Sequence, residues 1–359
     1  MAQAMPKAMD ALVMRDYHKY DIEQVPVPTP GFAEVLCAVD SVCICGTDPE
    51  ILEGSFKGRW PKGFPFIPGH EWSGTVVAAG PGSEGFGFRV GDRVAGTSHC
   101  GCGYCRMCTT GRYNLCENYG KSELGHRQYG HYTNGCYAEY MVTSIKSIFV
   151  LPQGVSLEEG AMVDGGSIAL HSVKRGQVQP GDVVAIIGPG PLGLLAVMCA
   201  HAIGAARVIL VGRGERLEKA KAFGAEVVDN SKADGVKAVR ELTGGKGADV
   251  TVDCAARGRT PREAVEMTRK GGRVVLTGVP LEEVALPLQR IVLEEMDVFG
   301  VRANRGTCEE TIALIAAGKM NVKALVTHRF PLRDFKKAYE VFTKRVDGAL
   351  KVLVKPSQR

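Results

Sequence analysis

Short apolar runs separated by glycine and proline fill the first 160 residues of the chain. The runs AEVLCAVDSVCI, SGTVVAAG, GDRVAGT and AEYMVT are rich in valine and broken by small or polar positions. Short β-branched runs bounded by turn residues are typical of antiparallel strands. The pattern therefore predicts a β-rich region over this part of the chain.

From about residue 181 onward, strand-like runs alternate with helical ones. The strand-like runs are 183–187, 208–211, 227–229, 250–253, 273–277 and 298–301. The helical runs between them are 192–203, 215–223, 234–242 and 262–269. This alternation predicts an α/β fold with a doubly wound parallel sheet. The C-terminal part adds two helical stretches and a strand, at 309–317, 332–344 and 350–354.

Composition narrows the class of protein. At 359 residues the chain exceeds one typical core, so we expect two domains. Its 45% hydrophobic and 23% charged residues are typical of a soluble globular protein. The net charge of +5 is not gathered into a run of lysine and arginine, so we expect no nucleic-acid partner.

One apolar segment, 183–206, carries no formal charge and is long enough to span a membrane. A glycine–proline cluster interrupts it, so we interpret it as a buried strand, a turn and a buried helix. The N-terminus lacks the pattern of a signal peptide. We therefore expect a cytoplasmic protein without a membrane partner, whose twelve cysteines are thiols or metal ligands rather than disulfides.

A glycine motif in VVAIIGPGPLG follows the first strand of the α/β region. Gly188, Gly190 and Gly193 have the spacing G-x-G-x-x-G, which allows a tight turn, close approach of a pyrophosphate and close helix packing. Pro191 and Leu192 complete this predicted dinucleotide site. The alternative is a glycine turn in an α/β domain that binds no nucleotide.

The acidic residue that usually holds the ribose of NAD is missing after the second strand. The sequence VILVGRGERLEKA places Gly212 and Arg213 there instead. Arg213 and Arg216 are suited to bind a 2′-phosphate, which favours NADP(H). The alternative is that both arginines are solvated and that Glu215 binds the ribose.

A cysteine cluster, CGCGYCRMCTTGRYNLC, covers residues 100–116. Cys102, Cys105, Cys108 and Cys116 have the spacing C-x2-C-x2-C-x7-C, which suits a closed tetrahedral zinc site. An iron–sulfur cluster is the rival, but its usual x3-C-P continuation is absent. Cys100 is left without a role.

A second set of possible ligands is dispersed along the chain. CICGTDPE contains Cys45, and PGHEWSG contains His70 and Glu71. Asp164 lies in AMVDGGSIALHSV. A thiolate, an imidazole and a carboxylate would hold a catalytic zinc and leave one position open. Singly, however, such residues are more often core packing or satisfied polar groups.

The stretch GHEWSGTVVAAGPGS, residues 69–83, fits the signature G-H-E-x2-G-x5-G-x2-S of zinc-containing alcohol dehydrogenases. The similarity extends over essentially the whole chain. It includes CGTD, VGDRV, the cysteine cluster at 100–116, called the four-cysteine lobe below, and GGRVVLTGVP. The protein resembles zinc-dependent medium-chain dehydrogenases of the sorbitol, threonine and butanediol dehydrogenase kind. The resemblance implies a GroES-like catalytic domain, 1–165 with 303–359, and a Rossmann domain, 166–302.

The resemblance also implies roles for single residues. Cys45, His70 and Asp164 would bind the catalytic zinc, with Glu71 as an alternate ligand. Asp48 would orient His70, and Thr47 would hydrogen-bond the substrate hydroxyl. The remaining cofactor residues, in GGRVVLTGVP, are Thr277, Gly278 and Val279.

The sequence departs from this family at two places. Glu50 stands where a histidine often passes a proton to solvent, so a carboxylate would take that role or be solvated. Residues 164–166 read DGG, where an acid followed by proline is common, so the size of the substrate is left open.

We expect an NAD(P)- and zinc-dependent oxidoreductase of a secondary alcohol or polyol. A metal-bound alcohol would have a lowered pKa, lose its hydroxyl proton and, as the alkoxide, transfer hydride to the nicotinamide. One alternative is a physiological aldehyde or ketone reductase, and another is an inactive nucleotide-sensing homologue. A zinc-ribbon nucleic-acid binder is disfavoured because Arg106 and Arg112 are the basic residues of the lobe. The resemblance further suggests a homodimer or homotetramer.

Overall fold

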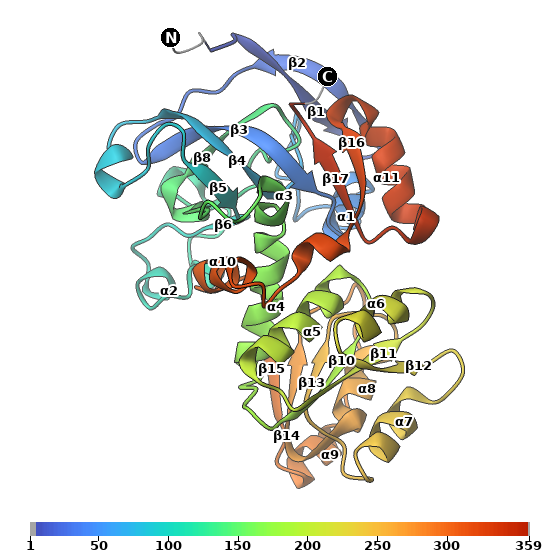
Figure 1. The fold of residues 1–359 in the computed structure, drawn as a ribbon. Helices are drawn as coiled ribbons and strands as arrows, with labels where there is room; N and C mark the ends of the chain where they lie inside the picture. The colour runs from blue at the N-terminus through green and yellow to red at the C-terminus, as the bar shows by residue number, and fades with distance from the viewer. Residues whose placement is uncertain (1–4, 358–359) are drawn as a thin grey trace. The chain divides into compact units, whose positions relative to one another are not determined.

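A computed structural model describes residues 5–357. Its described residues form two compact units, the first of 5–164, 308–316 and 322–357, the second of 165–307 and 317–321 (Figure 1). The domain boundaries expected from the resemblance, at 165/166 and 302/303, stay a prediction. Within the described part of the chain, no helix combines the length and apolar character needed to cross a membrane.

The first unit is built on a mostly antiparallel sheet. Among residues 5–357, seven strands pair in the order β16-β17-β3-β4-β5-β9, with β8 on β3. Their bounds are β3 (Glu34–Cys43), β4 (Glu71–Ala79), β5 (Arg93–Gly96), β8 (Tyr140–Ser144), β9 (Ile148–Val150), β16 (Val326–Pro331) and β17 (Lys351–Lys355). The C-terminal strand β17 pairs with β3, so both ends of the chain build one sheet.

Smaller elements surround this sheet. A hairpin, β1 (Ala8–Asp16) with β2 (Lys19–Pro26), and a short pair, β6 (His99–Cys100) with β7 (Arg127–Gln128), complete the strands. The helices are α1 (Thr47–Leu52), α2 (Arg106–Thr109), α3 (Leu157–Gly160), α10 (Cys308–Ala316) and α11 (Phe335–Lys344).

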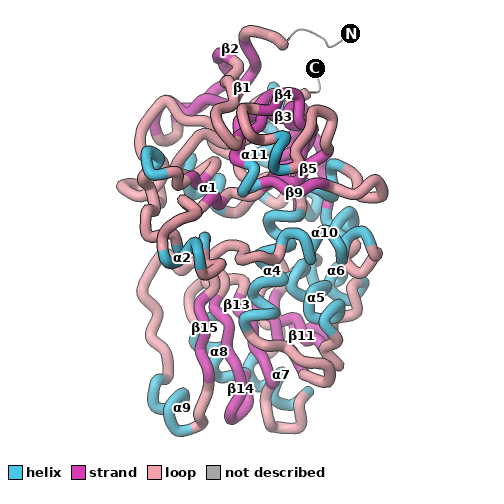
Figure 2. The backbone as a smooth tube through the Cα atoms, turned by 90° about the vertical axis from the view of Figure 1, so that its left-hand side faces the viewer, coloured by secondary structure: helices cyan, strands magenta, loops and turns pink. Residues whose placement is uncertain are grey.

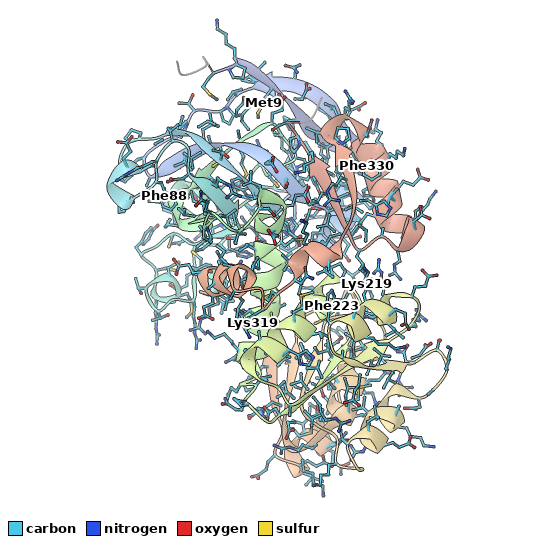
Figure 3. All side chains as sticks on the ribbon, viewed as in Figure 1. Met9, Phe88, Lys219, Phe223, Lys319 and Phe330 are labelled. Carbon is cyan, nitrogen blue, oxygen red and sulfur yellow. The ribbon has the colours of Figure 1, made fainter. Side chains whose placement is uncertain are left out.

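Aromatic side chains fill the core of this unit. Trp72, Tyr137 and Phe335 are fully buried in it. Gly96 on β5 must lack a side chain, because a Cβ there would lie 2.1 Å from the Trp72 ring. Phe88 and Phe330, labelled in Figure 3, come from distant parts of the chain and pack against the same core.

The second unit contains the predicted parallel sheet. Six strands among the described residues pair in the order β12-β11-β10-β13-β14-β15, and every pair is parallel. They are β10 (Val183–Ile187), β11 (Arg207–Gly212), β12 (Glu226–Asp229), β13 (Ala248–Asp253), β14 (Thr268–Leu276) and β15 (Asp297–Gly300). The chain order reverses between β10 and β13, where doubly wound folds bind their ligands.

Helices cover both faces of the parallel sheet (Figure 2). They are α4 (Val163–Arg175), α5 (Pro191–Ile203), α6 (Arg216–Ala222), α7 (Gly235–Leu242), α8 (Thr260–Met267) and α9 (Leu288–Leu293). Helices α5 and α8 both contact β10, and α6 and α7 pack beside them. Residues 184–186 of β10 are fully buried, as expected of a strand covered on both faces.

The sequence pattern located most of these elements. It missed β16, whose run VTHRFP is only half-buried and lacks alternation, and it gave no prediction for the helices α4 and α9. It also ran the helix at 262–269 too far, because α8 ends at Met267 and β14 begins at Thr268 without a loop.

Candidate active site and metal centres

The four predicted cysteines of the lobe meet in one cluster. The sulfur atoms of Cys102, Cys105, Cys108 and Cys116 lie within 4.8 Å of one another. The Sγ atoms of Cys102 and Cys108 are 3.9 Å apart, as are those of Cys105 and Cys116. A tetrahedral zinc with Zn–S bonds of about 2.3 Å separates its sulfurs by about 3.8 Å. The cluster therefore has the size that zinc requires.

N–H groups of the lobe point at these sulfur atoms. The Cys102 backbone donates to Cys116 Sγ at 3.4 Å, and the Asn118 amide donates to Cys102 Sγ at 3.4 Å. Burial opposes ionisation of Cys102, but backbone donors from Tyr104 and Cys105 outweigh it and lower its pKa to about 6. Such donors stabilise thiolates, the form that binds metal. Cys100 is buried outside this cluster.

A second possible metal group contains Cys45, His70 and Glu71, whose ligand atoms lie within 4.8 Å of one another. Strand pairing brings these distant residues together. The register of β3 and β4 places Cys43 opposite Glu71, so the loop after β3 and the start of β4 meet at one end of the sheet. Cys45 is half-exposed, whereas His70 and Glu71 are buried.

The carboxylate of Asp48, on α1, lies beside this metal group and contacts it. This carboxylate accepts hydrogen bonds from the Cys45 backbone at 2.8 Å and the Tyr137 hydroxyl at 2.7 Å, and it lies 3.4 Å from His70 Nδ1. Burial alone would raise the pKa of Asp48, yet the neighbouring His70 ring and the hydrogen bond from the Tyr137 hydroxyl lower it. A carboxylate at Nδ1 fixes the ring and directs Nε2 towards a metal.

Thr47 and Glu50 lie on the same helix. The Thr47 hydroxyl donates to Cys45 Sγ at 3.2 Å, so it stands beside the half-exposed sulfur. Glu50 is half-buried one helical turn further on.

Asp164 lies outside the compact group of three. It is fully buried near the start of α4, and its Oδ1 accepts from the Ser98 backbone at 3.4 Å. Burial raises its pKa to about 7, and the charge of Glu71 adds to this while His70 opposes it. Asp164 is therefore a near neighbour of His70 and Glu71, but the structure groups Glu71 with Cys45 and His70.

Lys351 is a member of this neighbourhood that sequence reasoning missed. It is 3% exposed on β17, and its ammonium forms an ion pair with the buried Glu71 carboxylate. A signal was available in the run ALKVLVK, because a lysine within an apolar strand is buried only when it is paired. Tyr137 and His131, whose ring lies 4.4 Å from that of His70, were also missed.

The predicted nucleotide-binding residues lie at the carboxyl ends of the parallel strands. Gly188 follows β10 with a φ of 105°, and Gly190 precedes α5, where Pro191 is the first helical residue. A Cβ on Gly193 would lie 1.9 Å from the Gly188 carbonyl oxygen. Leu192 lies in the first turn of α5.

The neighbouring strands contribute the other predicted cofactor residues. Gly212 ends β11, where a Cβ would lie 2.3 Å from Pro189, and Arg213 after it is exposed. Arg216 begins α6 and is half-buried. Thr277 follows β14 and is buried. Gly278 and the exposed Val279 come after it. Carboxyl ends of parallel strands are where such folds bind ligands.

The chain matches two families along its length. Residues 31–153 match the alcohol dehydrogenase GroES-like domain, and residues 191–317 match zinc-binding dehydrogenases. Sorbitol dehydrogenase of Bacillus subtilis is 32% identical over 361 residues, covering 100% of both chains. Human sorbitol dehydrogenase is 34% identical over 99% of this chain and 97% of its own.

A solved structure has the same fold over nearly the whole chain. A zinc-binding dehydrogenase from Sinorhizobium meliloti bound to NADP is 31% identical, with a TM-score of 0.88, and covers 98% of this chain and 100% of its own. The chain therefore belongs to the zinc-dependent medium-chain alcohol dehydrogenase family, with a GroES-like and a Rossmann-like fold. The predicted class, an NAD(P)-dependent oxidoreductase acting on CH–OH groups, is confirmed. The comparisons give no support to the reductase, sensor or nucleic-acid alternatives.

Proposed function

We propose that the protein oxidises a secondary alcohol or polyol with NADP in a zinc-dependent reaction. The observation that carries this proposal is that the ligand atoms of Cys45, His70 and Glu71 lie within 4.8 Å of one another. The buried Asp48 lies beside them. One thiolate and one imidazole beside carboxylates are the mixed ligand set of a catalytic zinc. The sorbitol dehydrogenases similar to this chain support a polyol as substrate.

The third ligand is a choice between two carboxylates. The negative charge of Glu71 is already compensated by the ammonium of Lys351. Glu71 would therefore attract a metal ion less strongly than an unpaired carboxylate. Burial disfavours the ionised form of Asp164, so a divalent cation beside it would relieve that cost. We therefore favour Cys45, His70 and Asp164 as ligands, with Glu71 as the alternate. The four cysteines of the lobe would hold a second, structural zinc.

When bound, the catalytic zinc acts as a Lewis acid that lowers the pKa of the substrate hydroxyl. The chain's own residues then supply orientation and a route for the proton. Asp48 holds the imidazole of His70. Thr47, whose hydroxyl stands beside Cys45 Sγ, would take up the proton of the alcohol while it releases its own hydroxyl proton. Glu50 would pass it towards solvent from the same helix.

The preference for NADP rests on the end of β11. No carboxylate stands there to repel a 2′-phosphate, and Arg213 is exposed beside Gly212. Pro189 packs on Gly212 so closely that a larger residue would displace the glycine loop. Similar solved structures hold NADP in one case and NADH in another, so the preference rests on the residues at the end of β11. Glu215 as a ribose ligand is the alternative, which would favour NAD.

Self-association is part of the proposal. Strand β15 lies at the edge of the parallel sheet, and α9, which precedes it in the chain, exposes Leu288, Val292 and Leu293 by 68–75%. An open edge with apolar neighbours is suited to pairing with a second copy. We therefore expect a homodimer or homotetramer, located in a reducing cytoplasm that keeps the cysteines as thiols.

A substrate panel tests the proposed function. Polyols, amino alcohols and short secondary alcohols would each be assayed with NADP and with NAD. We expect one polyol or secondary alcohol to be oxidised with NADP favoured, and Cys45→Ser to abolish turnover while the circular dichroism spectrum is unchanged. Full activity of Cys45→Ser would show that the catalytic metal is assigned to the wrong residues.

A further inference from the structure

The four-cysteine lobe is connected to the candidate active site by a chain of side chains. The segment that leaves the cluster is held against it at two points, since the Asn118 amide donates to Cys102 Sγ at 3.4 Å and the Glu117 backbone donates to Cys105 Sγ at 3.5 Å. Tyr119 comes next and donates its own backbone N–H to the Cys116 carbonyl at 3.1 Å. The cluster therefore fixes where Tyr119 lies.

The Tyr119 hydroxyl connects the lobe to a different loop through hydrogen bonds. It accepts a hydrogen bond from the Trp60 indole at 2.7 Å and donates one to the Gln128 side chain. Trp60 lies in the segment after α1, far from the lobe in sequence, and is only 7% exposed. A buried indole N–H needs an acceptor, so the Tyr119 hydroxyl sets the position of Trp60.

Trp60 in turn packs against the side chains beside the metal group. Its ring meets that of His131 edge to face at 4.8 Å, and the His131 ring lies 4.4 Å from the His70 ring. His131 is itself anchored, because its Nδ1 lies 3.1 Å from the Tyr129 carbonyl. A continuous row of contacts thus joins the cysteine cluster, Tyr119 and Trp60 to the ring that lies on His70.

We propose that Tyr119 is a positioning residue, through which the four-cysteine lobe sets the Trp60–His131 wall beside the catalytic metal group. The wall borders the His70 ring of the proposed metal site, so the lobe would influence the binding of a metal-held substrate and not only stability. The substrate part of this inference rests on the proposed function, whereas the positional coupling does not.

Tryptophan fluorescence offers a readout that does not depend on turnover. The chain has two tryptophans, and Trp72 is fully buried in the core, where it gives a constant background. Trp60→Phe identifies the share of the emission that comes from Trp60. In Tyr119→Phe the indole loses its acceptor, so we expect that share to shift in wavelength or intensity.

The matched control is Tyr104→Phe, which removes a hydroxyl of the same lobe that donates to the Leu124 carbonyl, away from Trp60. We expect Tyr119→Phe to raise KM for the alcohol at least threefold, with kcat within twofold and the zinc content unchanged, the pattern of lost binding. The control should match the wild type. Wild-type emission and KM in Tyr119→Phe would overturn the proposal.

The connection to the cluster is tested separately. Asn118→Leu removes the amide that donates to Cys102 and keeps all four thiols, so Trp60 emission should shift while both metals stay bound. In the Tyr119→Phe background the same substitution should add no further shift, because both act through one path. A shift that adds fully in the double variant would refute action through Tyr119.

Two further comparisons separate failure of the Tyr119 positioning role from failure of the proposed function. If Tyr119→Phe fails to fold, Trp60→Phe removes the same hydrogen bond from the other side, and it must raise KM to a similar extent. If the wild type oxidises no alcohol of the panel, the proposed function fails. The fluorescence comparison then still decides whether Tyr119 positions Trp60.

Discussion

His70 owes its position to residues on either side of its ring. Asp48 lies at Nδ1 and Cys45 lies in the same metal group. Burial works against a charged imidazole, but the neighbouring Cys45 and Asp48 raise the pKa of His70 well above its usual range. The site without metal thus attracts a positive charge, which is what a cation-binding group must do.

Replacing Asp48 by asparagine tests its bracing role. The amide cannot match the charge that orients His70, so zinc affinity or activity should fall by about 10–100-fold. Metal titration and kcat/KM measure this loss. Asp21→Asn, which alters an exposed ion pair with Lys336, should change neither quantity. Wild-type zinc affinity and activity in Asp48→Asn would contradict the role.

The Arg213 side chain tests the choice of cofactor. If it binds a 2′-phosphate, Arg213→Ala should weaken NADP(H) by about 10–100-fold, the value of one or two charge-assisted hydrogen bonds. NAD(H) should change by less than twofold. Lys219→Ala on α6, whose exposed side chain is labelled in Figure 3, is the control. Equal losses of affinity for both cofactors would contradict the binding of a 2′-phosphate by Arg213.

At the scale of elements, close contacts join the glycine loop to its helix. Gly193 on α5 packs against the Gly188 carbonyl, whereas a Cβ on Gly190 would meet nothing within 4 Å. The two glycines therefore serve different purposes within one motif. Gly193 allows helix and turn to pack, and Gly190 keeps space open above the helix N-terminus.

Alanine at each position separates these purposes. Gly193→Ala forces a Cβ to within 1.9 Å of backbone oxygen, so it should lower the free energy of unfolding by about 1–3 kcal/mol. Gly190→Ala should leave stability almost unchanged and weaken cofactor binding. Thermal unfolding and cofactor titration distinguish them. Equal stability of both variants would contradict the packing argument.

Ion pairs tie the C-terminal strands to α3. Glu158 on α3 forms a two-pronged pair with Arg329 on β16 and lies 3.4 Å from the Lys355 ammonium on β17. The Arg329 guanidinium is the main cause, with Lys355 assisting, of the lowering of the Glu158 pKa to about 2. The carboxylate therefore stabilises the folded state in its ionised form.

The pH dependence follows from this lowered pKa. The stabilisation is complete above the ordinary glutamate pKa near 4.5 and is lost as the pH falls towards 2. Glu158→Gln should thus be less stable than the wild type at pH 6, and the difference should shrink between pH 4.5 and 2. Denaturant unfolding at several pH values measures it. A difference independent of pH would contradict the ion-pair account.

At the scale of the whole molecule, both metal groups belong to the first unit, and the glycine loop belongs to the second. The two metal groups differ in character. Four thiolates would close one site completely, whereas the other group offers a thiol, an imidazole and a carboxylate, with Cys45 half-exposed. The conspicuous cysteine cluster is therefore the site less suited to chemistry.

Metal analysis tests this division. We expect about two zinc ions per chain, one for each group. A chelator should remove one of them first and abolish activity with it, because the site with an open position exchanges faster than the closed one. Activity that survives removal of the first ion, or bound iron with visible absorbance, would contradict the assignment.

The sequence by itself determined the α/β class, the four-cysteine group, the glycine loop and the family. These features depend on local spacing and periodicity, which the chain carries in short stretches. Tertiary structure decided which dispersed residues meet. Strand register brought Cys45 beside His70 and Glu71, β17 placed Lys351 there from the far end of the chain, and folding joined Tyr119 to Trp60. A local apolar run can indicate that a segment is buried, but strand register and side-chain reach join residues far apart in the chain, and no local pattern encodes which of them meet.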